Sequence, residues 1–120
     1  MKWTLDKAKP LCPQICEQVC LMIALGEFKA GEKMFSVRET AIAAGVNPNT
    51  VQKAFEKLEQ DGILYSVRGS GWFVNDDISH ARETLDNLVA DKTKAYFESL
   101  YALGMSADAI KNYVKEWDNE

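Results

Sequence analysis

Hydrophobic and polar positions along the chain alternate with two different periods, and the helical period comes first. From Pro10 to about Gly26 or Phe28, apolar residues recur every three or four positions, which predicts a first helix. Its central apolar residues are Ile15, Val19, Met22 and Ile23. The apolar surface continues around the other side with Leu21, Ala24 and Leu25. A helix that is apolar on both sides is buried on both sides, so we expect the C-terminal segment or a second subunit to cover the second one.

A capping box predicts the start of a short second helix. Ser36 stands three residues before Glu39, so each side chain is placed to bond the backbone N–H of the other residue. The residues between the two helices, 29–32, have the composition of a turn. Gly45 is expected to end the second helix, because glycine adopts the left-handed conformation of a helix C-terminus without strain. The residues expected to face inward are Val37, Ala41 and Ala44.

A third helix is predicted directly after that glycine. Asn47 is a favoured N-cap residue, and Pro48 suits the first helical position, where the N–H that proline lacks would have no partner. Gly62 is expected to close the helix. Its inward face carries Val51, Ala54, Phe55 and Leu58. Two helices separated only by Gly45 and Val46 predict a helix-turn-helix.

After Gly62 the period of the hydrophobic positions changes from helical to extended. Residues 63–67 and 72–74 are rich in β-branched and aromatic side chains, and Arg68-Gly69-Ser70-Gly71 lies between them as a hairpin loop. A helix-turn-helix followed directly by a two-stranded hairpin is the winged-helix arrangement. We therefore expect a winged helix-turn-helix domain over residues 1–75.

The remaining residues, 76–120, are predicted to form two helices. Ser79 is expected to cap a long helix that reaches about residue 103, and Ser106 to cap a short one. Such a tail cannot bury its own apolar stripe together with the outer face of the first helix, so we expect a symmetric partner, and a dimerisation hairpin. The alternative is a monomer whose tail packs on its own domain. The fold class is mostly α with a small β-hairpin wing. The expected dimer interface is Leu21, Leu25, Leu85, Leu88, Val89, Tyr96, Leu100, Leu103, Ile110, Val114 and Trp117.

Net charge changes this picture less than it first suggests. The 120 residues include 14 Lys and Arg and 18 Asp and Glu, a net charge of -4, whereas nucleic-acid-binding domains are typically basic. The acidic excess lies in the tail, because residues 1–74 carry 9 basic and 8 acidic side chains while residues 75–120 carry 5 and 10. The charge therefore allows DNA binding by the winged domain, and predicts few phosphate contacts with a shallow salt dependence.

Localisation is indicated by what the sequence lacks. It has no polybasic membrane-binding segment, no apolar run of transmembrane length and no signal-peptide core at its start. Its 3 cysteines are an odd number within nine residues, which is no disulfide framework. We expect a cytoplasmic protein without membrane contact.

The cysteines form a ladder on the first helix. Cys12, Cys16 and Cys20 follow one another at four-residue steps, which predicts Cys12 on the core side, Cys16 at its margin and Cys20 rotated further outward. Thiolates at this spacing can share a zinc, copper or arsenic centre, so one interpretation is a soft-metal or redox sensor. The other is three small hydrophobic residues in a buried helix. His80 is the only histidine, no second Cys or His cluster exists, and we expect no cofactor.

The start of the third helix carries residue types that suit DNA. A helix-turn-helix places this end in the major groove, where Asn and Gln pair with adenine edges and Lys serves phosphate or guanine. The alternative for Asn47 and Thr50 is helix capping alone. The residues expected to contact double-stranded DNA are Ser36, Arg38, Asn47, Asn49, Thr50, Gln52, Lys53, Arg68, Gly69, Ser70 and Gly71. Catalytic sets such as Ser/His/Asp are not assembled, so we do not expect an enzyme.

Residues 10–74 resemble the DNA-binding domain of GntR-type transcription regulators. The matching segments are Gln14-Ile15, residues 26–33, Ser36-Val37-Arg38-Glu39, Gly45-Val46-Asn47, Asn49-Thr50-Val51, Ala54-Phe55, Leu58-Glu59, Asp61-Gly62-Ile63 and residues 68–74. The opening Trp3, Leu5-Asp6 and Pro10 is similar to the YtrA subfamily, whose members end in two helices after the wing.

The resemblance implies a homodimeric repressor of a pseudo-palindromic operator near transporter genes, released by an effector that it does not identify. The chain departs from the family pattern at several positions. Met34-Phe35 replaces the usual Leu-Pro, and the family's cations are replaced at Pro48, Gln52 and Ser70. Fewer phosphate or guanine contacts are therefore expected. Two other functions remain: a thiol-based metal or redox regulator, and a winged-helix protein–protein adaptor that does not bind DNA.

Overall fold

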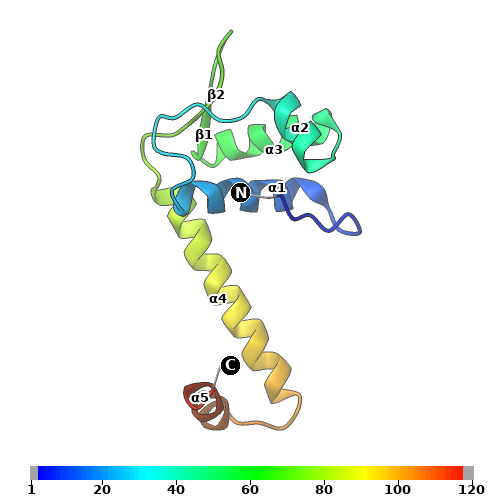
Figure 1. Ribbon diagram of the computed structural model, residues 1–120. Helices are drawn as coiled ribbons and strands as arrows, with labels where there is room; N and C mark the ends of the chain where they lie inside the picture. The colour runs from blue at the N-terminus through cyan, green and yellow to red at the C-terminus, as the bar shows by residue number, and fades with distance from the viewer. Residues whose placement is uncertain (1–2, 118–120) are drawn as a thin grey trace. The chain divides into compact units, whose positions relative to one another are not determined.

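The computed structural model describes residues 3–117 as five helices and one two-stranded hairpin (Figure 1). The elements are α1 (Leu11–Ala24), α2 (Val37–Ala44), α3 (Pro48–Gln60), β1 (Leu64–Val67), β2 (Gly71–Val74), α4 (Ser79–Tyr101) and α5 (Ala107–Lys115). The mostly helical fold class with a β-hairpin wing is therefore confirmed. None of the helices in the described part is long and apolar enough to span a membrane.

Contacts divide the chain into two compact units. The winged unit reaches Leu85, and the tail unit starts at Asp86, so α4 begins in one unit and ends in the other.

The capping predictions for α2 and α3 are both confirmed by the geometry. The Ser36 hydroxyl accepts a hydrogen bond from the Glu39 N–H at 3.0 Å, and the Glu39 carboxylate accepts one from the Ser36 N–H at 2.9 Å. Gly45 ends α2 in the left-handed conformation, with φ of 69°. Asn47 Oδ1 then accepts from the Asn49 N–H at 2.8 Å and caps α3. The α2–turn–α3 geometry is thus held by local hydrogen bonds.

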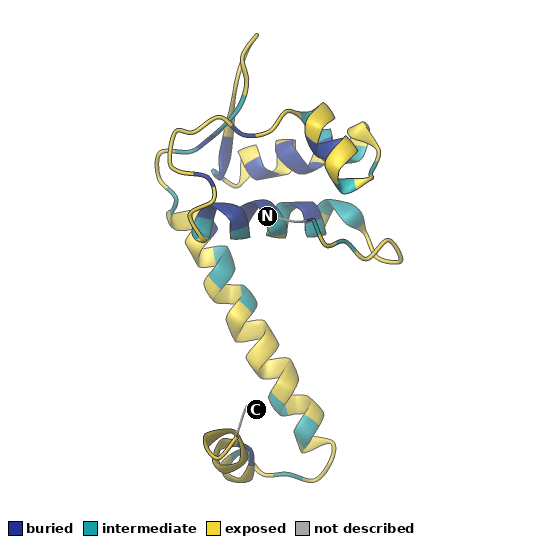
Figure 2. Cartoon of the chain, viewed as in Figure 1, coloured by how far each residue is buried: buried dark blue, intermediate teal, exposed yellow. Residues whose placement is uncertain are grey.

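The core of the winged unit lies between α1 and α3, which pack against each other (Figures 1 and 2). All four residues expected on the inward face of α3 are buried, and Phe55 is fully so. The Phe55 ring packs edge-on against Trp72 of β2, with 5.7 Å between ring centroids. From α1 the core takes Ile15, Val19, Cys20, Met22 and Ile23.

The turn at residues 29–32 leads into a pairing that the sequence did not indicate. The Gly31 N–H donates to the Val74 carbonyl at 2.9 Å, and the Met34 N–H donates to the Trp72 carbonyl at 2.8 Å. An isolated β-bridge joins Lys33 to Phe73. Residues 31–34 thereby satisfy the outer edge of β2, which would otherwise leave backbone groups unpaired.

The order of burial expected for the three cysteines is wrong. Cys20 is buried, while Cys12 and Cys16 are only half-buried. The start of α4 explains the difference, because Ala81 is part of the same core and the Thr84 hydroxyl is close enough to bond the Cys20 thiol. The first turns of α4 therefore cover the side of α1 that the ladder was expected to leave open.

Three smaller expectations also need correction. Helix α1 ends at Ala24, before the glycine, and α4 ends at Tyr101 rather than near residue 103. Ser79 is the first residue of α4, and its N–H donates a hydrogen bond to Asp77 Oδ1 at 2.9 Å. The side chain that caps α4 is therefore the carboxylate of Asp77, two residues earlier. An acidic side chain suits this position because it also complements the helix dipole.

The tail unit is stabilised locally but leaves most of its apolar side chains uncovered. Ser106 caps α5 as expected, accepting from the Ala109 N–H at 3.1 Å. Ile110 is fully buried within this unit. By contrast, Tyr96, Val114 and Trp117 are 44%, 50% and 59% exposed.

Candidate nucleic-acid interface

The side chains expected to contact DNA come from α2, the start of α3 and the wing. Helices α2 and α3 pack against each other across the turn, and Arg38 stands in the first turn of α2. Asn49 and Lys53 are exposed on α3. Within the described residues, none of these three side chains is shown in a hydrogen bond or ion pair. They form the accessible polar surface of the helix-turn-helix.

Asn47 and Gln52 are already engaged by the protein. The side-chain carbonyl of Asn47 caps α3, so the capping interpretation holds for this residue. The N–H₂ group of the same side chain is not used by that bond. Gln52 donates from Nε2 to Glu56 Oε2 at 3.1 Å, along the surface of α3. A base contact by Gln52 would have to replace that bond. Thr50 is half-buried, and the cap of α3 is formed by Asn47 rather than by Thr50.

The wing is a tight turn whose tip is exposed. The Ser70 N–H donates to the Val67 carbonyl at 2.9 Å, and β1 and β2 pair in antiparallel register from Leu64–Val74 to Val67–Gly71. Gly69 and Gly71 have φ values of 80° and 113°, which other residues rarely adopt. Glycine is required here by the turn itself, and it also keeps the tip slim enough for close approach to a duplex.

Lys33 is a cation near the wing that sequence reasoning did not select. A Cβ atom at Gly71 would lie 3.5 Å from Lys33 Cε, so the lysine stem runs along the wing at that glycine. The β-bridge between Lys33 and Phe73 fixes this position. Because Ser70 stands where the family has a wing lysine, Lys33 brings a positive charge to the same region from another strand. This pairing joins residues 40 positions apart in the chain, and the only signal at Lys33 in the sequence is that residues 31–33 match the family pattern.

Lys7 is a second cation that the sequence did not single out. Its Nζ donates to the Gly45 carbonyl at 2.7 Å, at the turn between α2 and α3. The segment that carries Lys7 is tied to α1 by two glutamine side chains. Gln14 bonds both the N–H and the carbonyl of Asp6, at 2.7 and 2.9 Å, and Gln18 bonds both backbone groups of Thr4. Thus the N-terminal segment holds the helix-turn-helix from the side.

Electrostatics at the start of α2 favour a charged Glu39. Hydrogen bonds from the backbone and hydroxyl of Ser36 lower the pKa of this carboxyl. Its negative charge is therefore held at the helix N-terminus, where the dipole favours it. Arg38, the next residue along the chain, is exposed and carries a positive charge. Within the described residues, no group of three or more His, Cys, Asp and Glu side chains is arranged to hold a metal ion.

Comparison with known proteins agrees with this geometry. The family model "Bacterial regulatory proteins, gntR family" matches residues 12–74. The transcriptional repressor YtrA of Bacillus subtilis is 31% identical over 111 residues, which are 89% of this chain and 83% of YtrA. A GntR family transcriptional regulator from Listeria monocytogenes superposes with a TM-score of 0.82 and 32% identity, over 95% of this chain and all of that one. The DNA-binding domain of AraR in complex with operator ORE1 superposes with a TM-score of 0.53 and 30% identity, over 62% of this chain and 93% of that one.

These similarities cover the winged fold and extend into the tail. Members of the matched family are DNA-binding transcription regulators rather than enzymes, as expected from the residues. The chain belongs to the GntR family of bacterial regulatory proteins.

Proposed function

We propose that this regulator is a homodimeric repressor that reads a pseudo-palindromic operator. Residues 1–75 bind DNA and residues 76–120 form the dimer. The observation that supports this assignment of the DNA-binding face is that Arg38, Asn49 and Lys53 are exposed on two helices packed as a helix-turn-helix. AraR's DNA-binding domain, a structural neighbour, was solved in complex with an operator, which supports DNA binding by this domain.

Each side chain has a role that follows from its chemistry. Asn49 is suited to reading an adenine edge in the major groove, because its amide donates and accepts at once. Arg38 and Lys53 are suited to phosphate or guanine, and Arg68 and Lys33 to phosphate beside the wing. The remaining proposed contacts are Ser36, Asn47, Thr50, Gln52, Gly69, Ser70 and Gly71.

Dimerisation is supported by the apolar surface of the tail. Tyr96, Val114 and Trp117 line a groove of about 380 Å³ within the tail unit, and all three side chains are substantially exposed. We assign a second copy of this chain to that surface, because symmetric pairing buries the same patch on both subunits. The other proposed interface residues are Leu21, Leu25, Leu85, Leu88, Val89, Leu100 and Leu103. Ile110 is already buried within the tail unit, so it contributes to the interior of that unit rather than to the dimer interface.

Repression follows from the operator site and from the relatives. YtrA of Bacillus subtilis is named a transcriptional repressor, and the tail of this chain is included in the match. A two-fold dimer presents two recognition helices to one face of the duplex, which predicts half-sites related by a dyad. The proposed targets are transporter genes beside its own gene, and deletion of the regulator should raise their transcripts.

The decisive experiment is a DNA-binding titration with the chain's own upstream region at two salt concentrations. Binding should weaken as salt rises, because each neutralised phosphate releases counterions. Arg38→Ala and Asn49→Ala should each weaken binding by about 1–3 kcal/mol without changing oligomeric state.

Lys57→Ala is the matched control. Lys57 is on α3, the same helix as Asn49, but lies in its last turn and forms an ion pair with Asp61 at 3.2 Å. Removing it changes the net charge as Arg38→Ala does, yet should leave affinity nearly unaltered. Normal binding by both Arg38→Ala and Asn49→Ala would refute the assigned face. Absence of any complex at low salt would favour a protein–protein adaptor.

A further inference from the structure

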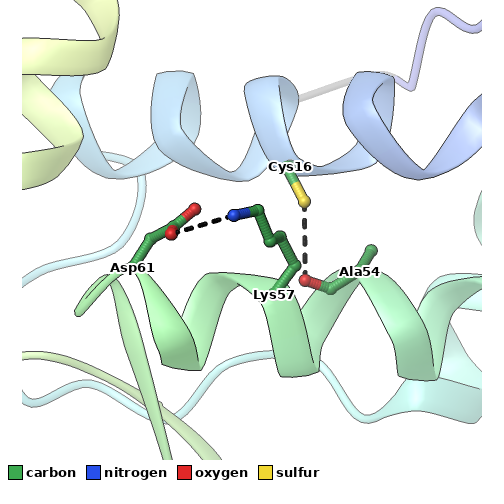
Figure 3. A network of polar contacts seen from close by, with 4 residues as sticks. All are labelled: Cys16, Ala54, Lys57 and Asp61. Atoms are coloured by element: carbon green, nitrogen blue, oxygen red, sulfur yellow. Dashed lines mark hydrogen bonds and ion pairs between the residues drawn. The ribbon is translucent and has the colours of Figure 1, made fainter.

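A pocket between α1 and α3 brings two thiols together with a polar rim. It has a volume of about 460 Å³, within the range of small-molecule sites, and its lining residues are Cys12, Pro13, Cys16, Glu17, Lys57 and Asp61. Figure 3 shows the Cys16 sulfur pointing across to α3, with the Lys57–Asp61 ion pair further along that helix. The pocket lies on the second half of α3, beyond the residues proposed to contact DNA.

The spacing of the two thiols suits a bridging atom better than a disulfide. Cys12 and Cys16 are four residues apart in α1, so their Cβ atoms are about 5–6 Å apart. A disulfide needs a Cβ–Cβ separation of about 3.5–4.5 Å, which would distort the helix. An atom that bonds both sulfurs adds its own two bonds to the bridge and spans the larger gap without such distortion.

The chemistry of the pocket restricts which ligands it can bind. Burial, and then the neighbouring Cys12, raise the pKa of the Cys16 thiol to about 12, so this sulfur is protonated at neutral pH. Zinc prefers four protein ligands in a structural site, and in the described part of the chain no group of three or more His, Cys, Asp and Glu side chains is arranged to hold a metal ion. The ligand therefore needs a soft central atom that can be bound by two sulfurs and that displaces the thiol protons as it binds. Trivalent arsenic bound to oxygen has these properties, because its oxygens leave with the protons as water.

We propose that Cys12 and Cys16 form a two-thiol site for a trivalent arsenical, and that its occupation weakens DNA binding. With arsenite, As(OH)₃, two S–H and two As–O bonds break, two As–S bonds form, and two water molecules leave. Arsenic remains trivalent, so neither an oxidant nor a reductant is required. With an organoarsenical of the type RAsO, one water molecule leaves and the organic group occupies the remaining pocket volume.

The coupling to DNA runs through the contact between Cys16 and α3. The Cys16 thiol donates to the Ala54 carbonyl at 3.4 Å, and Ala54 is fully buried in the middle of the recognition helix. Bonding this sulfur to arsenic removes the S–H donor and inserts bulk between the two helices. Because α3 carries Asn49 and Lys53, its displacement from α1 changes the face proposed for DNA. Linkage requires that DNA weaken arsenical binding by the same factor.

The first test counts thiols in the reduced full-length chain under anaerobic conditions. One equivalent of arsenite or phenylarsine oxide should consume two of the 3 thiols. Cys12→Ser and Cys16→Ser should each weaken binding by about 100-fold or more, since losing even an outer-shell partner of a bound centre costs 10–100-fold.

Cys20→Ser is the matched control, because Cys20 is on the same helix but outside the pocket. It should leave both the stoichiometry and the affinity unchanged, and circular dichroism would verify that each variant is folded. Zinc should show no stoichiometric binding. Equal affinity of Cys12→Ser and the wild type, consumption of one or all three thiols, or stoichiometric zinc binding would overturn the site.

The second test measures operator affinity with and without saturating arsenite, and it rests on the proposed function. We expect a loss of about 5- to 150-fold in the wild type and none in Cys12→Ser. Unchanged affinity of the wild type would overturn the coupling. If no DNA is bound even without arsenite, the proposed function fails, while the thiol count still decides the site independently.

Discussion

The winged unit and the tail unit are both built from amphipathic helices, but they bury the apolar faces of these helices to different extents. In the winged unit, residues from α1, α2, α3, both strands and the start of α4 close a continuous core. Among the described tail residues, 86–117, Ile110 alone is buried, and Figure 2 shows α4 mostly exposed along its length. An apolar face becomes a core only where the chain also supplies the opposite surface.

This difference separates what each unit contributes. The winged unit has its own core, so its stability should depend on side chains within one chain. In the tail unit Tyr96, Val114 and Trp117 are 44%, 50% and 59% exposed, so these apolar side chains should matter chiefly for association. The following changes test that separation, in order of the size of effect expected.

The largest effect is expected from a cavity in the winged unit. Phe55→Ala removes a fully buried ring and should lower the free energy of unfolding by about 3–5 kcal/mol, measured by urea denaturation. Tyr113→Ala removes an aromatic side chain of the tail that is 56% exposed, and should change the unfolding of the monomer by no more than about 0.5 kcal/mol. Similar losses in the two variants would contradict the contrast between the units.

An intermediate effect is expected on association. Trp117→Ala should raise the dissociation constant of the dimer about tenfold, or about 1.4 kcal/mol, because large aromatic side chains dominate such interfaces. Sedimentation velocity over a concentration series measures this directly. Lys111→Ala, at an exposed polar position on α5, is the control and should leave the constant unchanged. A wild-type chain that stays monomeric at every concentration would refute the role of the tail.

Helix caps give a smaller and local effect. Ser36→Ala should lower the free energy of unfolding of the winged unit by about 1 kcal/mol, since the Glu39 N–H loses its acceptor. Ser106→Ala removes the equivalent cap from the tail and should leave that transition unaltered. Thermal denaturation followed by circular dichroism compares the two.

The cap should also give a pH signature. Hydrogen bonds from Ser36 lower the pKa of Glu39 in the folded state, so this carboxylate stabilises the protein above its unfolded pKa. That contribution is lost as the pH falls through the lowered value. Ser36→Ala keeps the backbone N–H, which has the larger effect on this pKa, and removes only the hydroxyl. The wild type and Ser36→Ala should therefore differ slightly more at neutral pH than at pH 3, and a larger difference at pH 3 would contradict the role of the hydroxyl.

The smallest effect expected has the opposite sign. Thr40 is fully buried in α2, and its hydroxyl has no hydrogen-bond partner within the described structure. Thr40→Val keeps the branched shape while removing the unsatisfied group, so the winged unit should be stabilised, by up to about 1 kcal/mol. Thr40→Ser keeps the hydroxyl and loses a methyl group, and should destabilise it. A clear loss of stability in the valine variant would show that the hydroxyl is used.

The sequence by itself determined the features that depend on neighbours within one or two helical turns. The capping box of Ser36 and Glu39, the Asn47-Pro48 start of α3 and the hairpin at the wing were all predictable, because each is built from residues close in the chain. The inward face of α3 was predictable for the same reason. The fold class followed from the order of these elements, and the family from the resemblance of residues 10–74 to GntR-type regulators.

Only the tertiary structure decided which segments meet at long range. It buried Cys20 beneath the start of α4, brought Lys33 against Gly71 of the wing, and seated Lys7 on the turn after α2. Periodicity identifies an apolar or polar face but not the surface that opposes it. The opposing surface depends on loop closure and packing between distant segments, and for that reason a core formed in the winged unit while the tail kept its apolar face exposed.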